Sequence, residues 1–165
     1  MNIQIMGRNQ LDKFMQESTP DTYNVVFITE PGNQVISSVP LYCKDYIPVW
    51  FHDVCFPIGS YAAPKKEDIE QILAWSELRN EPFVVACAAG VSRSSATALL
   101  ITYQKTKSID EALAILNPDR HNPNALIVKM GSEILNCPEL YTRYSEWMNG
   151  KIDGWCEDVK LEIIE

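Results

Sequence analysis

Cys87 and Arg93 stand at the two ends of a short stretch, Cys-Ala-Ala-Gly-Val-Ser-Arg, whose residue types suit phosphate chemistry. A cysteine thiolate is a strong nucleophile, and a guanidinium presents a planar fork that matches two oxygens of a phosphate. An unperturbed cysteine is only a few per cent thiolate at neutral pH, so the stretch must stabilise the anion. Several charge-assisted hydrogen bonds, at about 1.5 to 3 kcal/mol each, are sufficient for that.

The surroundings of Cys87 favour such a site. The apolar run before it predicts a buried strand, and the residues after it predict a helix. A tight strand-to-helix turn gathers backbone N–H groups into one concavity, and the helix N-terminus adds partial positive charge. Gly90 can take conformations that side chains forbid. The predicted phosphate-binding residues are Ala88, Ala89, Gly90, Val91, Ser92 and Arg93. Cys87 would lie beneath the phosphorus atom.

Cleavage of a phosphate ester by a thiolate also needs an acid for the leaving oxygen and then a base for water. Asp53 is the best candidate, because it follows a short apolar run and opens a loop that contains Pro and Gly and can move. Asp45, Glu67 and Asp68 are weaker candidates, the last two in the first turn of a predicted helix. Ser94, at the start of the next helix, would donate a hydrogen bond to the departing thiolate.

Each of these residues also has a purely structural interpretation. Cys87 can be a small buried hydrophobe, and Arg93 can form a surface ion pair. Asp53 can cap a turn, and Ser94 can bond the first backbone N–H groups of a helix. The position of the Cys-x5-Arg stretch between a strand and a helix favours the functional interpretation of Cys87 and Arg93. For Asp53 and Ser94 both interpretations stay open.

The elements that position these residues alternate along the chain. Apolar runs predict strands at residues 24–29, 48–51 and 82–86. Helical periodicity predicts helices at residues 65–78, 92–104, 109–116, 125–135 and 139–148. Strands interleaved with helices favour an α/β sandwich with a mostly parallel central sheet flanked by helices. We expect residues 1–165 to form a single domain, and assign no element to the last fifteen residues.

Composition narrows the class of protein. The 165 residues are 46% hydrophobic and 22% charged, as in folded globular proteins. Fourteen Lys and Arg against twenty-two Asp and Glu give a net charge of −8, which disfavours nucleic acid and anionic membranes as partners. The sequence shows no basic start followed by an apolar leader and no long apolar run. We therefore expect a cytoplasmic protein that does not contact a membrane.

The cysteines are odd in number, scattered and unpaired as Cys-x-x-Cys, which argues against a disulfide framework and a structural zinc site. They are Cys43, Cys55, Cys87, Cys137 and Cys156. We expect no metal and no cofactor. Under oxidation, Cys43 or Cys55 could form a protective disulfide with Cys87.

The stretch around Cys87 resembles the signature His-Cys-x-x-Gly-x-x-Arg-Ser/Thr of the protein tyrosine and dual-specificity phosphatases. The residues that match are Cys87, Gly90, Arg93 and Ser94, with Phe51-His52-Asp53 upstream and Arg120 and Pro123-Asn124 downstream. Residues 28–32 further resemble small bacterial and phage members of this group. The resemblance covers roughly residues 22–136. One departure is Ala86, which stands where the family has the His that helps to hold the loop.

The resemblance implies a cysteine-dependent phosphatase that hydrolyses phosphate monoesters through a phospho-cysteine intermediate. Its substrate would be a phosphorylated protein or a small phosphate ester, with phosphotyrosine first and phosphoserine or phosphothreonine also admitted. A phosphoinositide, a nucleotide or an RNA 5′-phosphate stays open as an alternative substrate. Asp53 lies at a separation from Cys87 that is typical of the dual-specificity group. The resemblance implies that Asn124 supports the site, while a turn and helix start is an equally good structural interpretation of Asn124. The oligomeric state is not predicted.

The same residues admit other functions. A phosphate-binding module without turnover is the main alternative, because Ala86 replaces the family's His. Sulfur-transfer loops lack the Gly-x-x-Arg-Ser continuation, and arsenate reduction needs additional resolving cysteines within reach. A nucleotide-binding loop is excluded, because no Gly-Lys-Ser/Thr follows a Gly-rich turn.

Overall fold

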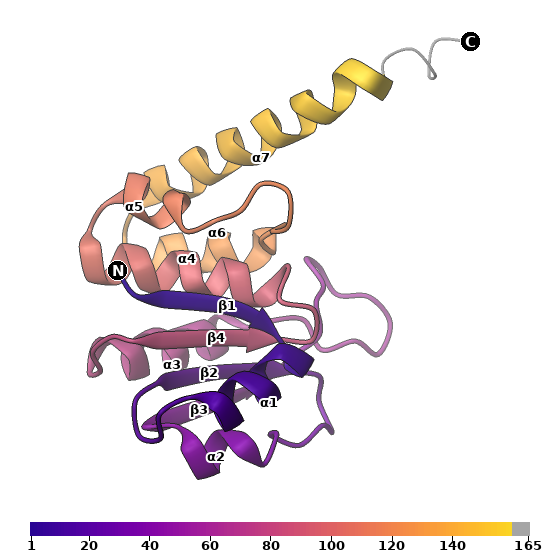
Figure 1. The fold of residues 1–165 in the computed structure, drawn as a ribbon. Helices are drawn as coiled ribbons and strands as arrows, with labels where there is room; N and C mark the ends of the chain where they lie inside the picture. The colour runs from indigo at the N-terminus through magenta and orange to yellow at the C-terminus, as the bar shows by residue number, and fades with distance from the viewer. Residues whose placement is uncertain (160–165) are drawn as a thin grey trace.

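The computed structural model describes the backbone of residues 1–159 and the side chains of residues 1–151 (Figure 1). Its strands are β1 (Ile3–Gly7), β2 (Asn24–Thr29), β3 (Asp45–Trp50) and β4 (Phe83–Cys87). Its helices are α1 (Arg8–Glu17), α2 (Ser38–Tyr42), α3 (Lys66–Glu77), α4 (Arg93–Thr106), α5 (Ile109–Ala114), α6 (Ala125–Ile134) and α7 (Pro138–Val159).

The four strands form one parallel sheet in the order β1-β4-β2-β3. Gly7 at the end of β1 is paired with Cys87 at the end of β4, and Thr29 at the end of β2 is paired with Trp50 of β3. The carboxyl ends therefore meet at one edge, on the right of Figure 1. This is the edge at which open α/β sheets bind ligands. The predicted α/β class with a parallel sheet flanked by helices is confirmed.

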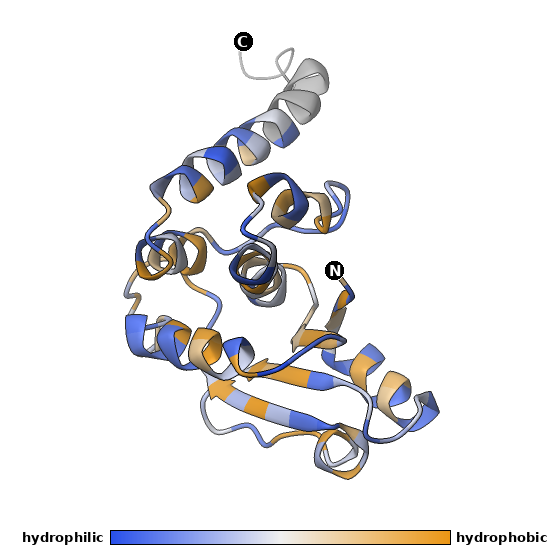
Figure 2. Ribbon diagram, turned by 90° about the vertical axis from the view of Figure 1, so that its left-hand side faces the viewer, coloured by the Kyte–Doolittle hydropathy of each residue, from blue (hydrophilic) through white to orange (hydrophobic). Residues whose placement is uncertain are grey.

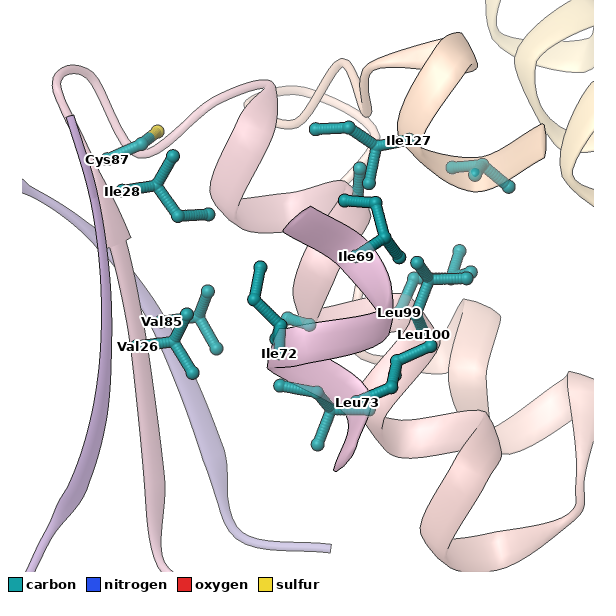
Figure 3. Close-up of a cluster of buried hydrophobic side chains, with 14 of the residues drawn as sticks. Val26, Ile28, Ile69, Ile72, Leu73, Val85, Cys87, Leu99, Leu100 and Ile127 are labelled. Atoms are coloured by element: carbon teal, nitrogen blue, oxygen red, sulfur yellow. The ribbon is translucent and has the colours of Figure 1, made fainter. Parts of the chain in front are cut away.

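Helices cover both faces of the sheet, and Figure 2 shows hydrophobic residues concentrated in the strands and in the helices packed on them. α1 and α2 pack on the face that carries Phe27, Val84 and Ala86. α3 and α4 cover the face that carries Val26, Val85 and Cys87, and α5 and α6 pack on the outer side of α4 (Figure 3). α7 packs on α5 and α6, away from the sheet. Because neighbouring residues of a strand face opposite ways, Ala86 and Cys87 lie in different cores.

The predicted strands and helices are present, with ends displaced by a few residues. The helix expected at residues 139–148 begins at Pro138 and continues to Val159. β1, α1 and α2 were not predicted. The apolar run of β1 is interrupted by Gln4, α2 contains a proline, and α1 buries only Leu11 and Met15. Such short or narrow apolar patterns are difficult to separate from loop sequence.

Two kinds of feature are absent from the part of the chain that the structure describes. No helix there has the length and apolar content needed to cross a membrane. No three His, Cys, Asp or Glu side chains of that part gather closely enough to hold a metal ion. The cytoplasmic location stays a prediction.

Candidate active site

The turn between β4 and α4, residues 87–93, lies at the carboxyl edge of the sheet, and we call it the Cys87 loop. Three of its carbonyl oxygens accept hydrogen bonds from backbone N–H groups outside the loop. The N–H of Arg8 donates to the carbonyl of Ala88 (3.2 Å), that of Asn122 to the carbonyl of Val91 (2.9 Å), and that of Asn124 to the carbonyl of Ser92 (3.2 Å). The C=O and N–H of one trans peptide point in opposite directions. The N–H groups that follow these carbonyls therefore face the inner side of the loop, as an anion site requires.

Gly90 is required by the packing of this loop on β1. Its φ is +71°, a conformation that residues with a side chain rarely adopt. A Cβ added at Gly90 would lie 2.5 Å from the backbone nitrogen of Gly7 and 2.5 Å from the carbonyl carbon of Met6. The close approach of two backbones, rather than the turn alone, explains the glycine.

Cys87 lies at the floor of the loop and is only 3% exposed. Its Sγ forms a hydrogen bond with the Ser94 Oγ at 3.0 Å, and Ser94 is fully buried. A hydroxyl can donate to a thiolate, so this contact fits the predicted role of Ser94. Figure 3 shows the Cys87 side chain on the face of the sheet that packs against α3 and α4.

The Arg93 guanidinium is buried and held from two sides. Its Nη1 donates to the carbonyl oxygen of Phe51 at 2.8 Å, and its Nη2 donates to the Glu30 Oε1 at 2.7 Å. Its Nε is buried and has no hydrogen-bond partner among the described residues. Leaving a buried donor unsatisfied costs about 1 to 3 kcal/mol, so an acceptor on a ligand would relieve this cost. The interpretation of Arg93 as a surface ion pair is wrong, since its side chain is 4% exposed.

Glu30 is a site residue that the sequence analysis did not identify. It follows β2 directly, and its Oε2 accepts hydrogen bonds from the Thr29 hydroxyl and the Asn33 amide. Burial acts to raise the pKa of Glu30, but the hydrogen bond and the charge of Arg93 outweigh it and hold the pKa below its ordinary value. Glu30 is therefore ionised at neutral pH and fixes the guanidinium. A carboxylate just beyond the end of a buried strand was the signal available in the sequence.

Asp53 is exposed, and its carboxylate is tied to the Cys87 loop. Its Oδ1 accepts hydrogen bonds from the Ser92 Oγ at 2.7 Å and from the Asn124 Nδ2 at 2.9 Å. Oδ2 accepts none from the described residues. Asn124 is also the N-cap of α6, where its Oδ1 accepts from the backbone of Ile127 at 3.1 Å. The structure thus brings together Asp53, Asn124 and the Cys87 loop.

The competing carboxylates have structural partners elsewhere. Asp45 pairs with Arg79 at 2.5 Å, at the amino end of β3 and away from Cys87. Asp68 accepts a hydrogen bond from the backbone of Lys65 at 2.8 Å and so closes the first turn of α3. Glu67 lies exposed in the same turn. Asp53 is therefore the only one of the four candidates that bonds to the Cys87 loop.

Cys43 cannot form the predicted disulfide with Cys87. It precedes β3, and the pairing of Asp45 with Asn24, and of Asn24 with Phe83, places it at the amino edge of the sheet. Cys87 is four residues further along β4, about 13 Å at 3.3 Å per residue. A disulfide requires Cα atoms within about 7 Å. Cys55 is exposed on the loop after Asp53, and Cys156 lies outside the described side chains.

Ala86 is fully buried among apolar side chains on the face covered by α1 and α2. The family's His at this position would have to be accommodated in that core. The backbone bonds from Arg8, Asn122 and Asn124 hold the Cys87 loop here instead. Holding the loop in this chain therefore does not depend on a side chain at position 86.

Comparisons with known proteins support the fold. No protein-family model and no curated protein matches the sequence. A human tyrosine phosphatase-like serine/threonine/tyrosine-interacting protein is similar in structure, with a TM-score of 0.53 at 16% identity over 79% of this chain and 85% of that one. DUSP15 is similar in structure, with a TM-score of 0.54 at 14% identity, over 88% of this chain and 91% of the DUSP15 chain. PTPMT1, in complex with PI(5)P, is also similar, with a TM-score of 0.54 at 11% identity, over 87% of this chain and 94% of the PTPMT1 chain.

These likenesses extend over most of each chain, and the Cys-x5-Arg stretch of this protein lies at the carboxyl end of the strand β4, between that strand and α4. At such low identities, structural similarity speaks for the fold. The predicted resemblance is confirmed at this level: the chain has the fold of the protein tyrosine and dual-specificity phosphatases.

Proposed function

We propose that this chain is a cysteine-dependent phosphatase that hydrolyses phosphate monoesters on proteins, phosphotyrosine first and phosphoserine or phosphothreonine as well. The observation that carries the proposal is the buried Nε of Arg93, which has no hydrogen-bond partner in the part of the chain that the structure describes. It belongs to the loop that has Cys87 at its floor and inward-facing N–H groups. A phosphate oxygen is the acceptor that suits such a donor.

In the first step, the Cys87 thiolate attacks the phosphorus atom and forms an S–P bond. The bond from phosphorus to the ester oxygen breaks, and the leaving oxygen takes a proton from Asp53. Oδ1 of Asp53 already accepts two hydrogen bonds, so Oδ2 is the atom that would carry this proton. The products are the free alcohol or phenol and a phospho-cysteine.

In the second step, water attacks the phospho-cysteine, and the Asp53 carboxylate takes its proton. The S–P bond breaks, inorganic phosphate forms and the thiolate returns. The Ser94 hydroxyl, 3.0 Å from Sγ, donates a hydrogen bond to this leaving thiolate. Glu30 and the Phe51 carbonyl hold Arg93 while charge builds on the phosphoryl oxygens.

The test is steady-state release of phosphate from two aryl phosphates, one with a nitrophenol and one with a plain phenol leaving group, between pH 5 and 8. Cys87→Ser is expected to abolish turnover of both. Asp53→Asn is expected to lower kcat about 100-fold for the phenol ester, and less for the nitrophenol ester, because nitrophenolate leaves without a proton. Asp21→Asn is the matched control, since Asp21 is exposed and has a φ of +61° that asparagine tolerates well.

The second candidate is a phosphate-binding module without turnover, favoured by Ala86 in place of the family's His. It predicts no phosphate release by the wild type, while phosphate analogues still bind and Arg93→Lys weakens that binding. Turnover that survives Cys87→Ser would contradict both candidates.

A further inference from the structure

Three large apolar side chains are exposed within a few residues of Asp53. Phe56 is 62% exposed, Ile58 is 42% exposed and Tyr61 is 56% exposed. We call residues 53–61 the Asp53 loop. Single exposed apolar side chains are common on soluble proteins, whereas three on one short loop beside a candidate site favour a binding surface.

Hydrogen bonds at its base fix the Asp53 loop beside the Cys87 loop. The backbone N–H of His52 donates to the Ala62 carbonyl at 2.7 Å, and the N–H of Ala62 donates to the His52 Nδ1 at 2.9 Å. The His52 and Tyr61 rings meet edge to face, with centroids 4.8 Å apart. Tyr61 therefore lies close to Asp53, which itself bonds to Ser92.

The remaining apolar residues of the loop are also within reach of the Cys87 loop. Phe56 is three residues after Asp53, which limits the distance between their Cα atoms to about 11 Å. A peptide in extended conformation covers that distance with three or four residues. A peptide whose phosphorylated residue is bound at Cys87 would thus pass the exposed side chains with its neighbouring residues.

The charge of this part of the chain favours a peptide over a membrane surface as the partner of the Asp53 loop. Residues 45–64 contain no Lys and no Arg, and the whole chain has a net charge of −8. Membrane surfaces that attract peripheral proteins are anionic and need basic residues for binding. An apolar and uncharged segment of a peptide meets no such electrostatic cost.

We propose that the Asp53 loop binds apolar side chains that stand beside the phosphorylated residue of a protein substrate. This rests on the part of the proposed function that places a phosphate in the Cys87 loop. Phe56 and Ile58 form the contact surface, and Tyr61 closes it toward Asp53. The site is therefore selective for phosphorylated segments flanked by apolar residues.

The test measures binding, so that it does not depend on turnover. Full-length Cys87→Ser is titrated with two phosphotyrosine peptides of equal length and charge, one with Leu and one with Ser at the positions two and three residues from the phosphotyrosine. We expect the Leu peptide to bind about tenfold more tightly, which corresponds to about 1.4 kcal/mol. Adding Phe56→Ser and Ile58→Ser is expected to reduce this preference to less than about twofold. Leu78→Ser, at the end of α3 where Leu78 is 84% exposed, is the control and keeps the preference.

Equal dissociation constants for the two peptides would overturn the inference, as would a preference that survives Phe56→Ser and Ile58→Ser. A dimer in sedimentation that these two substitutions dissociate would assign the surface to a second copy of the chain and also overturn it. If neither peptide binds, the result would contradict a phosphate-binding site in the Cys87 loop and therefore also the proposed function. A retained Leu preference in a protein whose wild type releases no phosphate would support the inference and contradict the phosphatase.

Discussion

Replacing Asn124 by alanine removes three hydrogen bonds at once. Its Oδ1 caps α6 by accepting from the backbone of Ile127, and its Nδ2 donates to the Asp53 carboxylate and to the carbonyl of Val54. Asn124 is 3% exposed, so water does not replace these partners easily. Asn124→Ser keeps a good N-cap residue but loses the amide donor. The two variants separate the cap from the contacts with Asp53 and Val54.

The expected magnitudes follow from these contacts. Loss of the N-cap costs about 1 kcal/mol, and each lost side-chain hydrogen bond costs about 1 kcal/mol. Asn124→Ala should therefore lower the free energy of unfolding by about 3 kcal/mol, and Asn124→Ser by about 2 kcal/mol. A chain of this size loses about 2 to 4 °C in Tm for each kcal/mol, so both variants stay folded at 25 °C. Both should lower kcat roughly tenfold, since a misplaced catalytic group costs up to 100-fold and Ser92 still holds Asp53.

Urea unfolding measures the first effect, and phosphate release from a phenyl ester measures the second. Asn9→Ala is the control, because Asn9 is exposed on α1, and should change stability by less than about 0.5 kcal/mol. Equal loss of stability in Asn124→Ala and Asn124→Ser would refute the role of the cap. An unchanged kcat in either variant would refute the role of the amide in positioning Asp53.

Three further predictions concern other parts of the structure. Gly90→Ala should destabilise the fold by more than about 2 kcal/mol in urea unfolding, because the new Cβ would lie 2.5 Å from backbone atoms of β1 at a φ of +71°; wild-type stability would contradict this packing. Burial acts to raise the pKa of Glu30, but Arg93 holds it below the ordinary value. The pair therefore stabilises the fold above the unfolded pKa of about 4.3, and this stability is lost as the pH falls through the lower folded pKa. The difference in unfolding free energy between the wild type and Glu30→Gln should be full at pH 7 and narrow below about pH 4, and a constant difference would be inconsistent with the ion pair. Burial and a nearby carboxylate raise the pKa of Cys43 to about 11, so at pH 8 iodoacetamide should alkylate the exposed Cys55 well before Cys43 in mass spectra; equal rates would argue against that burial.

The sequence alone predicted phosphate chemistry at the Cys87 loop, because the signals for it are local. Cys87, Gly90 and Arg93 lie within seven consecutive residues. The apolar run before them predicts a strand and the helical periodicity after them predicts a helix, and both patterns can be recognised without the tertiary structure. Asp53 was predicted as the acid for a similar reason, since it lies just after a short apolar run and opens a loop that contains Pro and Gly. The class of fold also followed from the alternation of strands and helices.

Only the tertiary structure decided which residues complete the site. Glu30 and Arg93 are 63 positions apart, and Asp53 and Asn124 are 71 positions apart. The first pair meets because the strand order β1-β4-β2-β3 places the ends of β4 and β2 side by side. The second pair meets because Asn124, at the start of α6, is held against the Cys87 loop by the hydrogen bond from its backbone to Ser92. The strand order depends on how the helices bury both faces and on β1, an edge strand whose apolar run is interrupted by Gln4 and which the sequence pattern did not predict. Local patterns specify which elements form, whereas the neighbours of each element are set by packing across the whole chain, and so the partners of Arg93 and Asp53 could not be read from the sequence.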